Sequence, residues 1–158
     1  MGNPSRLSTV RKLARETHYQ QKMVILRNIR MLPSKHRLRD NHDFRHVYSR
    51  GRSYVHPMVV LYVMLRDSMA DPQSQSHRVG FVVSKKQGNA VVRNRIKRRL
   101  REAFRIHQGS IREGLFDLVF VARSPLKNSD WLAVQAALQS LLKRADLFQS
   151  VTGSISKH

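Results

Sequence analysis

The sequence predicts a small α+β domain in which helices pack on a single sheet. Hydrophobic residues make up 41% of the 158 residues, which is enough for a folded core. The length suits one domain and is short for two. Patterns typical of helices and strands follow one another in the order helix, strands, helix, strand, helix, and this order predicts the α+β class.

The first helix is predicted to begin near residue 40 and to end at Gly51. Asp40 or Asn41 can accept hydrogen bonds from the N–H groups at its start. A glycine commonly closes a helix at its C-terminal end. Three residues share one helical face at the i, i+3, i+4 spacing: Phe44, Val47 and Tyr48.

Four segments have the apolar and β-branched composition of strands. Residues 52–56 predict a short edge strand, and residues 58–65 (MVVLYVML) predict a buried one. Residues 78–84 (RVGFVVS) and 115–122 (LFDLVFVA) predict two more. The polar stretch 67–76 is predicted to be a loop.

A strongly basic helix is predicted over residues 89–107. Seven of the residues 93–105 are Lys or Arg, and Glu102 is the only acid among them. The apolar residues of this segment recur at the spacing of one helical stripe: Val92, Ile96, Leu100, Ala103 and Phe104. The stripe can dock on the core while the other faces of the helix present cations.

The last helix is predicted to begin after residue 129. Asn128 or Ser129 can cap it, with Asp130 in its first turn. One face carries the apolar residues Trp131, Val134, Leu138, Leu141 and Leu142. This face predicts a second helix that packs on the core.

Composition divides the chain into three parts. Residues 1–33 hold seven Lys or Arg and one acid, and predict a flexible basic N-terminal extension, although an amphipathic helix over 9–30 is compatible with them. Residues 34–148 form the predicted domain. Residues 149–158 are rich in Ser and predict a disordered tail.

The charge points to a polyanionic partner. Thirty Lys and Arg face ten acids, which gives a formal net charge of +20, and removing residues 1–33 still leaves +14. Such a charge favours phosphate backbones, and nucleic acid is the first candidate, with anionic membrane surfaces as the alternative. No apolar run approaches the roughly 18–20 residues that span a bilayer. The chain contains no cysteine, so disulfides and thiolate metal sites are excluded.

The side chains of an autonomous hydrolase are missing from the sequence. The closest acid pairs, Asp40/Asp43 and Asp67/Asp71, have no second acidic cluster beside them that could complete a two-metal site. His42 and His46 could share a ligand face at i, i+4, but no third ligand is indicated. No phosphate-binding glycine loop, nucleophile elbow or zincin motif occurs. We therefore expect no catalytic residue and no metal site in the protein itself.

Binding residues are better represented than catalytic ones. Lys85 and Lys86 precede a Gly88-Asn89 turn, so their side chains and the N–H groups of the helix start would converge on one place that favours phosphate. On the basic helix, the residues at i, i+4 and i+8 form a ridge with two further arginines beside it and two on the far flank: Arg93, Lys97 and Arg101, then Arg98 and Arg105, then Arg95 and Arg99. A solvated face would mix charges of both signs, whereas this one accumulates like charges.

Aromatic residues could hold an unpaired strand by stacking. Phe44 and Tyr48 share a helical face, and Tyr62 lies inside a strand. Phe44 is at least as well explained as a core residue. The tyrosines could keep their hydroxyl groups at a wet surface.

Three stretches together resemble the signature of the bacterial ribonuclease P protein subunit: residues 78–86 (RVGFVVSKK), 88–91 (GNAV) and 93–98 (RNRIKR). The Arg-Asn-Arg motif of that family matches Arg93, Asn94 and Arg95. The resemblance covers about residues 34–148, whereas residues 1–30 depart from the pattern. It implies a sandwich in α-β-β-β-α-β-α order with one mixed sheet.

The resemblance also implies a function. The protein would bind a catalytic RNA, and that RNA with Mg²⁺ would cleave precursor tRNA to free its 5′ leader, in the cytoplasm and without a membrane or a further protein partner. The residues implied to bind the RNA subunit are Arg93, Asn94, Arg95, Lys97, Arg98, Arg101, Lys85 and Lys86. The leader would lie in a cleft with Phe44, Tyr48 and Tyr62. A structural ribosomal protein and a DNA-binding regulator are the alternative hypotheses.

Overall fold

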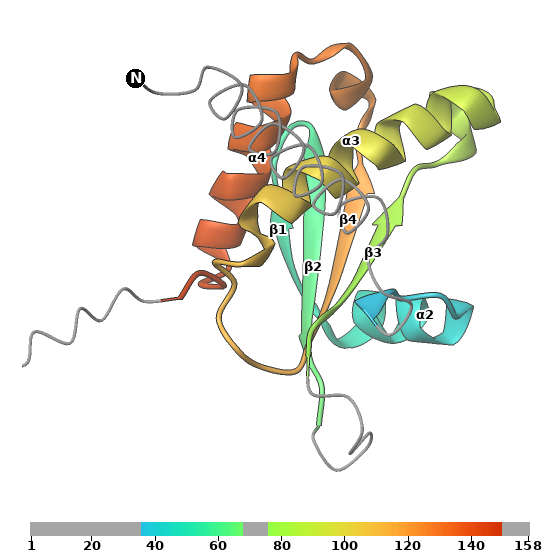
Figure 1. Cartoon of the computed structure of the whole chain (residues 1–158). Coiled ribbons are helices and arrows are strands. Elements are labelled where there is room, and N and C mark those ends of the chain that lie inside the picture. Colours follow the sequence, from blue (N-terminus) through green and yellow to red (C-terminus); the bar gives the residue numbers. More distant parts are fainter. Residues whose placement is uncertain (1–35, 68–75, 150–158) are drawn as a thin grey trace, which may run out of the picture. The chain divides into compact units, whose positions relative to one another are not determined.

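The computed structural model describes residues 36–67 and 76–149 (Figure 1). The predicted extension 1–33 lies outside the described residues, as do most of the predicted loop 67–76 and the predicted tail beyond Gln149. The limits of the predicted domain therefore stay a prediction.

The described elements follow the predicted α-β-β-β-α-β-α order. They are α2 (Asn41–Arg50), β1 (Arg52–Val55), β2 (Val59–Leu65), β3 (Arg78–Val82), η2 (Lys85–Gln87), α3 (Ala90–Gln108), β4 (Phe116–Ala122), η3 (Ser124–Asn128) and α4 (Trp131–Arg144). The labels η2 and η3 denote short 3₁₀ helices. The α+β class is confirmed.

The four strands form one mixed sheet in the order β1-β2-β4-β3. β2 runs antiparallel to both β1 and β4, whereas β3 runs parallel to β4. The register pairs Val119 of β4 with Tyr62 on one side and with Gly80 on the other. β4 is therefore central, and β1 lies at the edge that the sequence predicts for it.

The two faces of the sheet carry different helices because strand side chains alternate between faces. On one face, Leu61, Leu118 and Phe120 pack in the main core with residues of α3 and α4. On the other face, Val119 packs with Val47 of α2 and with Leu38. Figure 1 accordingly shows α3 and α4 next to each other against the sheet, with α2 apart from both of them.

The predicted apolar stripe orients α3. Ile96, Leu100, Ala103 and Phe104 are buried, and Val92 packs against the same core. Burial of a large apolar side chain stabilises the fold by about 1.5–3 kcal/mol, so the stripe outweighs the repulsion between the cations on the rest of the helix. The cationic faces are thereby directed away from the core.

The helix starts agree with the predictions only in part. The Asn89 side chain accepts a hydrogen bond from the Val92 N–H at 3.0 Å and caps α3. Asp40 occupies the N-cap position of α2, but its side chain makes no capping bond. The prediction that Asn128 or Ser129 caps α4 is wrong, because the side chain of Asp130 accepts from the Ala133 N–H at 2.7 Å. Residue 128 instead belongs to η3.

Gly51 ends α2, as predicted, for a steric reason. Its φ of −77° lies in the ordinary range, so the left-handed closure that glycine usually supplies is absent. A Cβ atom at this position would lie 2.4 Å from the Val47 carbonyl oxygen. The chain can therefore turn into β1 here only without a side chain.

Candidate nucleic-acid interface

The basic surface begins at η2, just before α3. Lys85 and Lys86 are exposed, while the neighbouring Gln87 is buried and donates from Nε2 to the Ala122 carbonyl at 2.7 Å. Gly88 has a φ of +142°, a value that strongly favours glycine. Gln87 and Gly88 thus fix the turn that presents both lysines beside the start of α3. Sequence reasoning assigned no role to Gln87.

The exposed side of α3 carries the predicted cations. Arg95 and Arg98 are exposed, and Arg93, Lys97 and Arg101 are half-buried. Within residues 36–67 and 76–149, the arginines in ion pairs are Arg66 and Arg78, which lie outside α3. Glu102 forms no ion pair within these ranges. The structure therefore holds the predicted RNA-binding cations together on one helix without neutralising them.

Arg99 differs from the other arginines of α3. Its guanidinium group donates to the Leu126 carbonyl at 3.1 Å and also to the Ser129 carbonyl. These bonds fasten η3 to α3. Arg99 therefore has a structural role that its position on the far flank with Arg95 did not predict, because two of its N–H groups are bonded to the backbone of the domain.

The predicted aromatic residues meet on the other face of the sheet. The rings of Tyr48 and Tyr62 lie edge to face, with centroids 4.9 Å apart. Tyr48 is 41% exposed. Burial, followed by the neighbouring Tyr62, raises the pKa of the Tyr48 hydroxyl, so this group stays a neutral hydrogen-bond donor.

Phe44 lies farther across the sheet than this pair, over β3, because its ring covers Gly80, which is in the same row of the sheet as Val119 and Tyr62. The ring is half-buried in the small cluster formed by Leu38, Val47 and Val119. It covers Gly80 so closely that a Cβ atom there would lie 2.6 Å from the ring. The core explanation of Phe44 thus has direct support.

The sheet surface next to α2 is not fully covered. Tyr62, Val82 and Val121 point to the α2 side, and all three remain half-buried. The other two helices, α3 and α4, pack on the opposite face. A partly exposed apolar strip therefore extends from the Tyr48–Tyr62 pair across the sheet.

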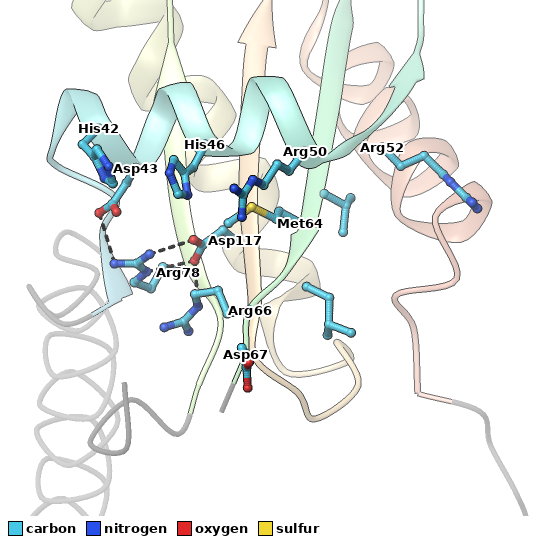
Figure 2. Close-up of a pocket in the computed structure, with 12 residues that line it drawn as sticks. His42, Asp43, His46, Arg50, Arg52, Met64, Arg66, Asp67, Arg78 and Asp117 are labelled. Carbon is cyan, nitrogen blue, oxygen red and sulfur yellow. Dashed lines mark hydrogen bonds and ion pairs between the residues drawn. The ribbon is translucent and has the colours of Figure 1, made fainter. Parts of the chain in front are cut away.

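A pocket of about 760 Å³, separate from the two tyrosines, is lined in part by α2 (Figure 2). His42 and His46 line it with rings 4.4 Å apart, and Arg50 and Arg52 contribute further cations. Helical spacing places His42, His46 and Arg50 of α2 roughly opposite Phe44 and Tyr48, whereas Arg52 belongs to β1. Among the residues that the structure describes, no group of three His, Cys, Asp or Glu side chains could hold a metal ion.

The inner end of this pocket is a buried ion-pair network (Figure 2). Asp117 is fully buried and accepts two bonds from Arg78, from Nε at 2.9 Å and from a terminal nitrogen at 2.7 Å. Arg66 pairs with the same carboxylate at 2.9 Å, and Arg78 reaches Asp43 at 3.1 Å. Among the acids noted as close pairs in the sequence, Asp43 is paired with Arg78. Asp71 lies outside the described residues.

Sequence reasoning missed this network, although one signal was present. Asp117 is the only charged residue in the apolar segment 115–122. A carboxylate in a buried strand requires a cationic partner, because an unpaired buried charge is very costly. The partner could not be named, since Arg78 is 39 positions away in the chain.

No helix in the described ranges is long and apolar enough to cross a membrane. This finding covers α2, α3 and α4.

Comparisons with known proteins agree with the geometry. The family model described as Ribonuclease P matches residues 32–146. The chain is 44% identical over 112 residues to the ribonuclease P protein component of Clostridium novyi, which covers 71% of this chain and 95% of the relative. A relative from Clostridium botulinum with the same description is 39% identical over 124 residues, which is 78% of this chain and 98% of the relative.

Solved structures give the same result. The RNase P protein of Staphylococcus aureus matches with a TM-score of 0.62 and 36% identity, over 72% of this chain and 98% of that one. The RNase P protein of Thermotoga maritima matches with a TM-score of 0.59 and 34% identity, over 68% and 96% of the two chains. The chain therefore belongs to the ribonuclease P protein family, the protein components of the ribonuclease that processes tRNA.

Proposed function

We propose that this protein binds the RNA subunit of ribonuclease P with η2 and α3, and that it holds the 5′ leader of precursor tRNA on the sheet surface beside α2. The observation that carries the proposal is the uncompensated charge of α3. Its RNA-facing cations are held at fixed positions by the buried stripe and make no ion pair with the described carboxylates.

The RNA-subunit surface would consist of Lys85, Lys86, Arg93, Asn94, Arg95, Lys97, Arg98 and Arg101. Guanidinium groups bind phosphate oxygens in a two-point geometry, and lysines add mobile point charges. Asn94 is exposed between two of the arginines and can both donate and accept hydrogen bonds. A phosphate backbone that follows α3 would meet donors along the length of the helix.

The leader surface would consist of Phe44, Tyr48 and Tyr62. The exposed part of Tyr48 and the half-buried Tyr62 offer ring surface on which a base can stack. The apolar strip of Val82 and Val121 continues this surface. Stacking does not depend on base identity, so we expect the leader to be bound with little sequence preference.

In this proposal the protein contributes binding and the RNA carries out the cleavage. Mg²⁺ would be held mainly by the RNA. The protein would reduce the repulsion between two polyanions, its RNA subunit and its substrate, and would thereby lower the Mg²⁺ concentration that the reaction requires. We expect this work to take place in the cytoplasm.

The test is cleavage of precursor tRNA by a bacterial ribonuclease P RNA at low Mg²⁺, with and without the protein. Correct 5′ maturation that depends on the protein is the expected result. Binding to the RNA without any gain in cleavage would contradict the proposal and would favour a purely structural RNA-binding role.

A further inference from the structure

A short segment before α2 extends the sheet beyond β3. β3 lies at the end of the strand order, and Arg37 forms a parallel bridge with Val79 on its outer edge. The Leu38 N–H donates to the Val79 carbonyl at 3.1 Å. The position of Arg37 is therefore set by backbone hydrogen bonding, and not only by the preferences of its own long side chain.

The direction of the Arg37 side chain follows from its neighbour. Leu38 is 6% exposed and packs on the α2 side of the sheet with Val47 and Val119. Successive side chains in an extended segment point to opposite faces. Arg37 must then point to the other face, where α3 packs.

Arg37 thereby joins two arginines of α3. Residue 77, next to this bridge, contacts α3 directly, because the His77 and Phe104 rings lie 6.1 Å apart. Arg101 is one turn from Phe104 on the same helix. Burial lowers the pKa of Arg101, and the charges of Arg37 and Arg98 lower it further, as expected for three neighbouring guanidinium groups.

No carboxylate balances this cluster. Glu102 is four positions after Arg98, a spacing that often gives an ion pair, yet none forms. The carboxylates of Asp43 and Asp117 pair with Arg66 and Arg78 instead. Three like charges are thus gathered from two segments without a counter-charge among the described residues.

We propose that Arg37, Arg98 and Arg101 together bind one phosphate group of the RNA subunit. This inference rests on the proposed function and extends its RNA-binding surface from α3 around the β3 edge to the segment before α2. A phosphodiester supplies the charge that the cluster lacks, and its oxygens match the planar donor arrangement of guanidinium groups. The RNA subunit is the expected source, because two of the three arginines lie on the helix proposed to bind it.

The first experiment measures the affinity of the full chain for a bacterial ribonuclease P RNA as a function of salt. Arg37→Gln should weaken binding about tenfold and reduce the slope of log affinity against log salt by about one. Arg101→Gln should have the same effect. The fold-loss of affinity in the double variant should be smaller than the product of the two single losses, because both side chains hold one phosphate. Arg45→Gln, an exposed change of equal charge on α2, should have a much smaller effect.

Two outcomes would overturn the inference. One is an Arg37→Gln variant that behaves like Arg45→Gln, and the other is full additivity of Arg37→Gln and Arg101→Gln. A loss confined to precursor-tRNA affinity, with RNA-subunit affinity unchanged, would overturn the assignment to the RNA subunit.

A second experiment needs no RNA and so separates this inference from the proposed function. Inorganic phosphate should raise the Tm of the wild-type protein and of Arg45→Gln by more than that of Arg37→Gln. Without phosphate, Arg37→Gln should be no less stable than the wild type, since it removes like-charge repulsion. Equal phosphate-dependent shifts in Tm for all three proteins would contradict the proposed phosphate-binding cluster. If the wild-type protein shows the expected shift but does not support RNA-dependent cleavage, only the proposed function is contradicted.

Discussion

The protein uses arginine in two opposite ways, and the buried network at Asp117 and the exposed face of α3 show the contrast. Arg66 and Arg78 converge on the fully buried carboxylate of Asp117, and Arg78 also pairs with Asp43, so two carboxylates balance the two cations. Arg95 and Arg98 are exposed and have no acidic partner among the described residues. Pairing therefore separates arginines that stabilise the domain from those that are available to a partner.

The largest expected effect comes from removing the centre of the paired network. Asp117→Ala leaves two arginines without their buried counter-charge and should destabilise the fold by about 3–5 kcal/mol. Urea unfolding monitored by the single Trp131 measures this loss. Asp43→Ala, at the more exposed end of the network, is the matched control and should cost much less. A loss below about 1 kcal/mol for Asp117→Ala would show that the network is not a stabilising element.

The next effect should appear in binding and not in stability. Arg93→Ala combined with Arg95→Ala should weaken affinity for the RNA subunit by about 10–100-fold and slow cleavage at low Mg²⁺, because two phosphate contacts are lost. The free energy of unfolding should change by less than about 0.5 kcal/mol. Arg45→Ala with Lys143→Ala removes the same charge from exposed positions elsewhere and serves as the control. An unchanged cleavage rate in the Arg93/Arg95 variant would remove these residues from the interface.

Arg99 tests the distinction within a single helix. Arg99→Ala loses the bonds to the Leu126 and Ser129 carbonyls and should destabilise the protein by about 1.5 kcal/mol. Its effect on RNA affinity should be well below that of Arg95→Ala, although both lie on α3. The two variants are compared by thermal unfolding and by RNA titration in the same buffer. A larger loss of affinity than of stability in Arg99→Ala would place this residue on the RNA-binding surface.

A smaller effect is expected on the opposite face of the sheet. Tyr62→Leu keeps an apolar side chain but removes the ring, and should reduce the preference for precursor over mature tRNA by about fivefold, at the lower end of stacking energies. Tyr62→Phe keeps the ring and should retain the preference. Measured affinities of the holoenzyme for both tRNA forms decide the outcome. Equal losses for precursor and mature tRNA would place the leader elsewhere.

The smallest effect concerns the pH dependence of stability and the His77 imidazole, which the fold favours in its neutral form. Burial lowers the pKa of His77 below 6.5, and the charges of His36 and Arg66 lower it further. The unfolded chain then binds a proton more readily than the folded one, so this contribution is complete above pH 6.5 and is lost as the pH falls toward the folded pKa. His77→Gln should therefore flatten the decrease in Tm between neutral and mildly acidic pH. An unchanged pH profile would show that His77 does not titrate differently in the two states.

Much of the fold could be predicted because its signals are local. The spacing of Ile96, Leu100 and Phe104 determined which side of α3 is buried, and so which side carries its charge. The apolar runs located the strands to within a few residues. The first and last helix starts were less certain, since several polar residues near each start can cap, and the choice of Asp130 depends on how η3 positions the preceding chain.

The α+β class and the basic helix with its apolar stripe can be read from the sequence alone, because helix and strand periodicity and net charge are properties of neighbouring residues. Which cations are already paired depends instead on how the chain folds. Arg78 meets Asp117 across 39 positions, and Arg99 meets the Leu126 carbonyl across 27. Arg37 is directed to the α3 side of the sheet because its segment pairs with the edge of β3. Ion pairs and hydrogen bonds depend on distances in space. Residues far apart in the chain come close together only when the sheet forms, so the order of residues does not reveal which of them pair.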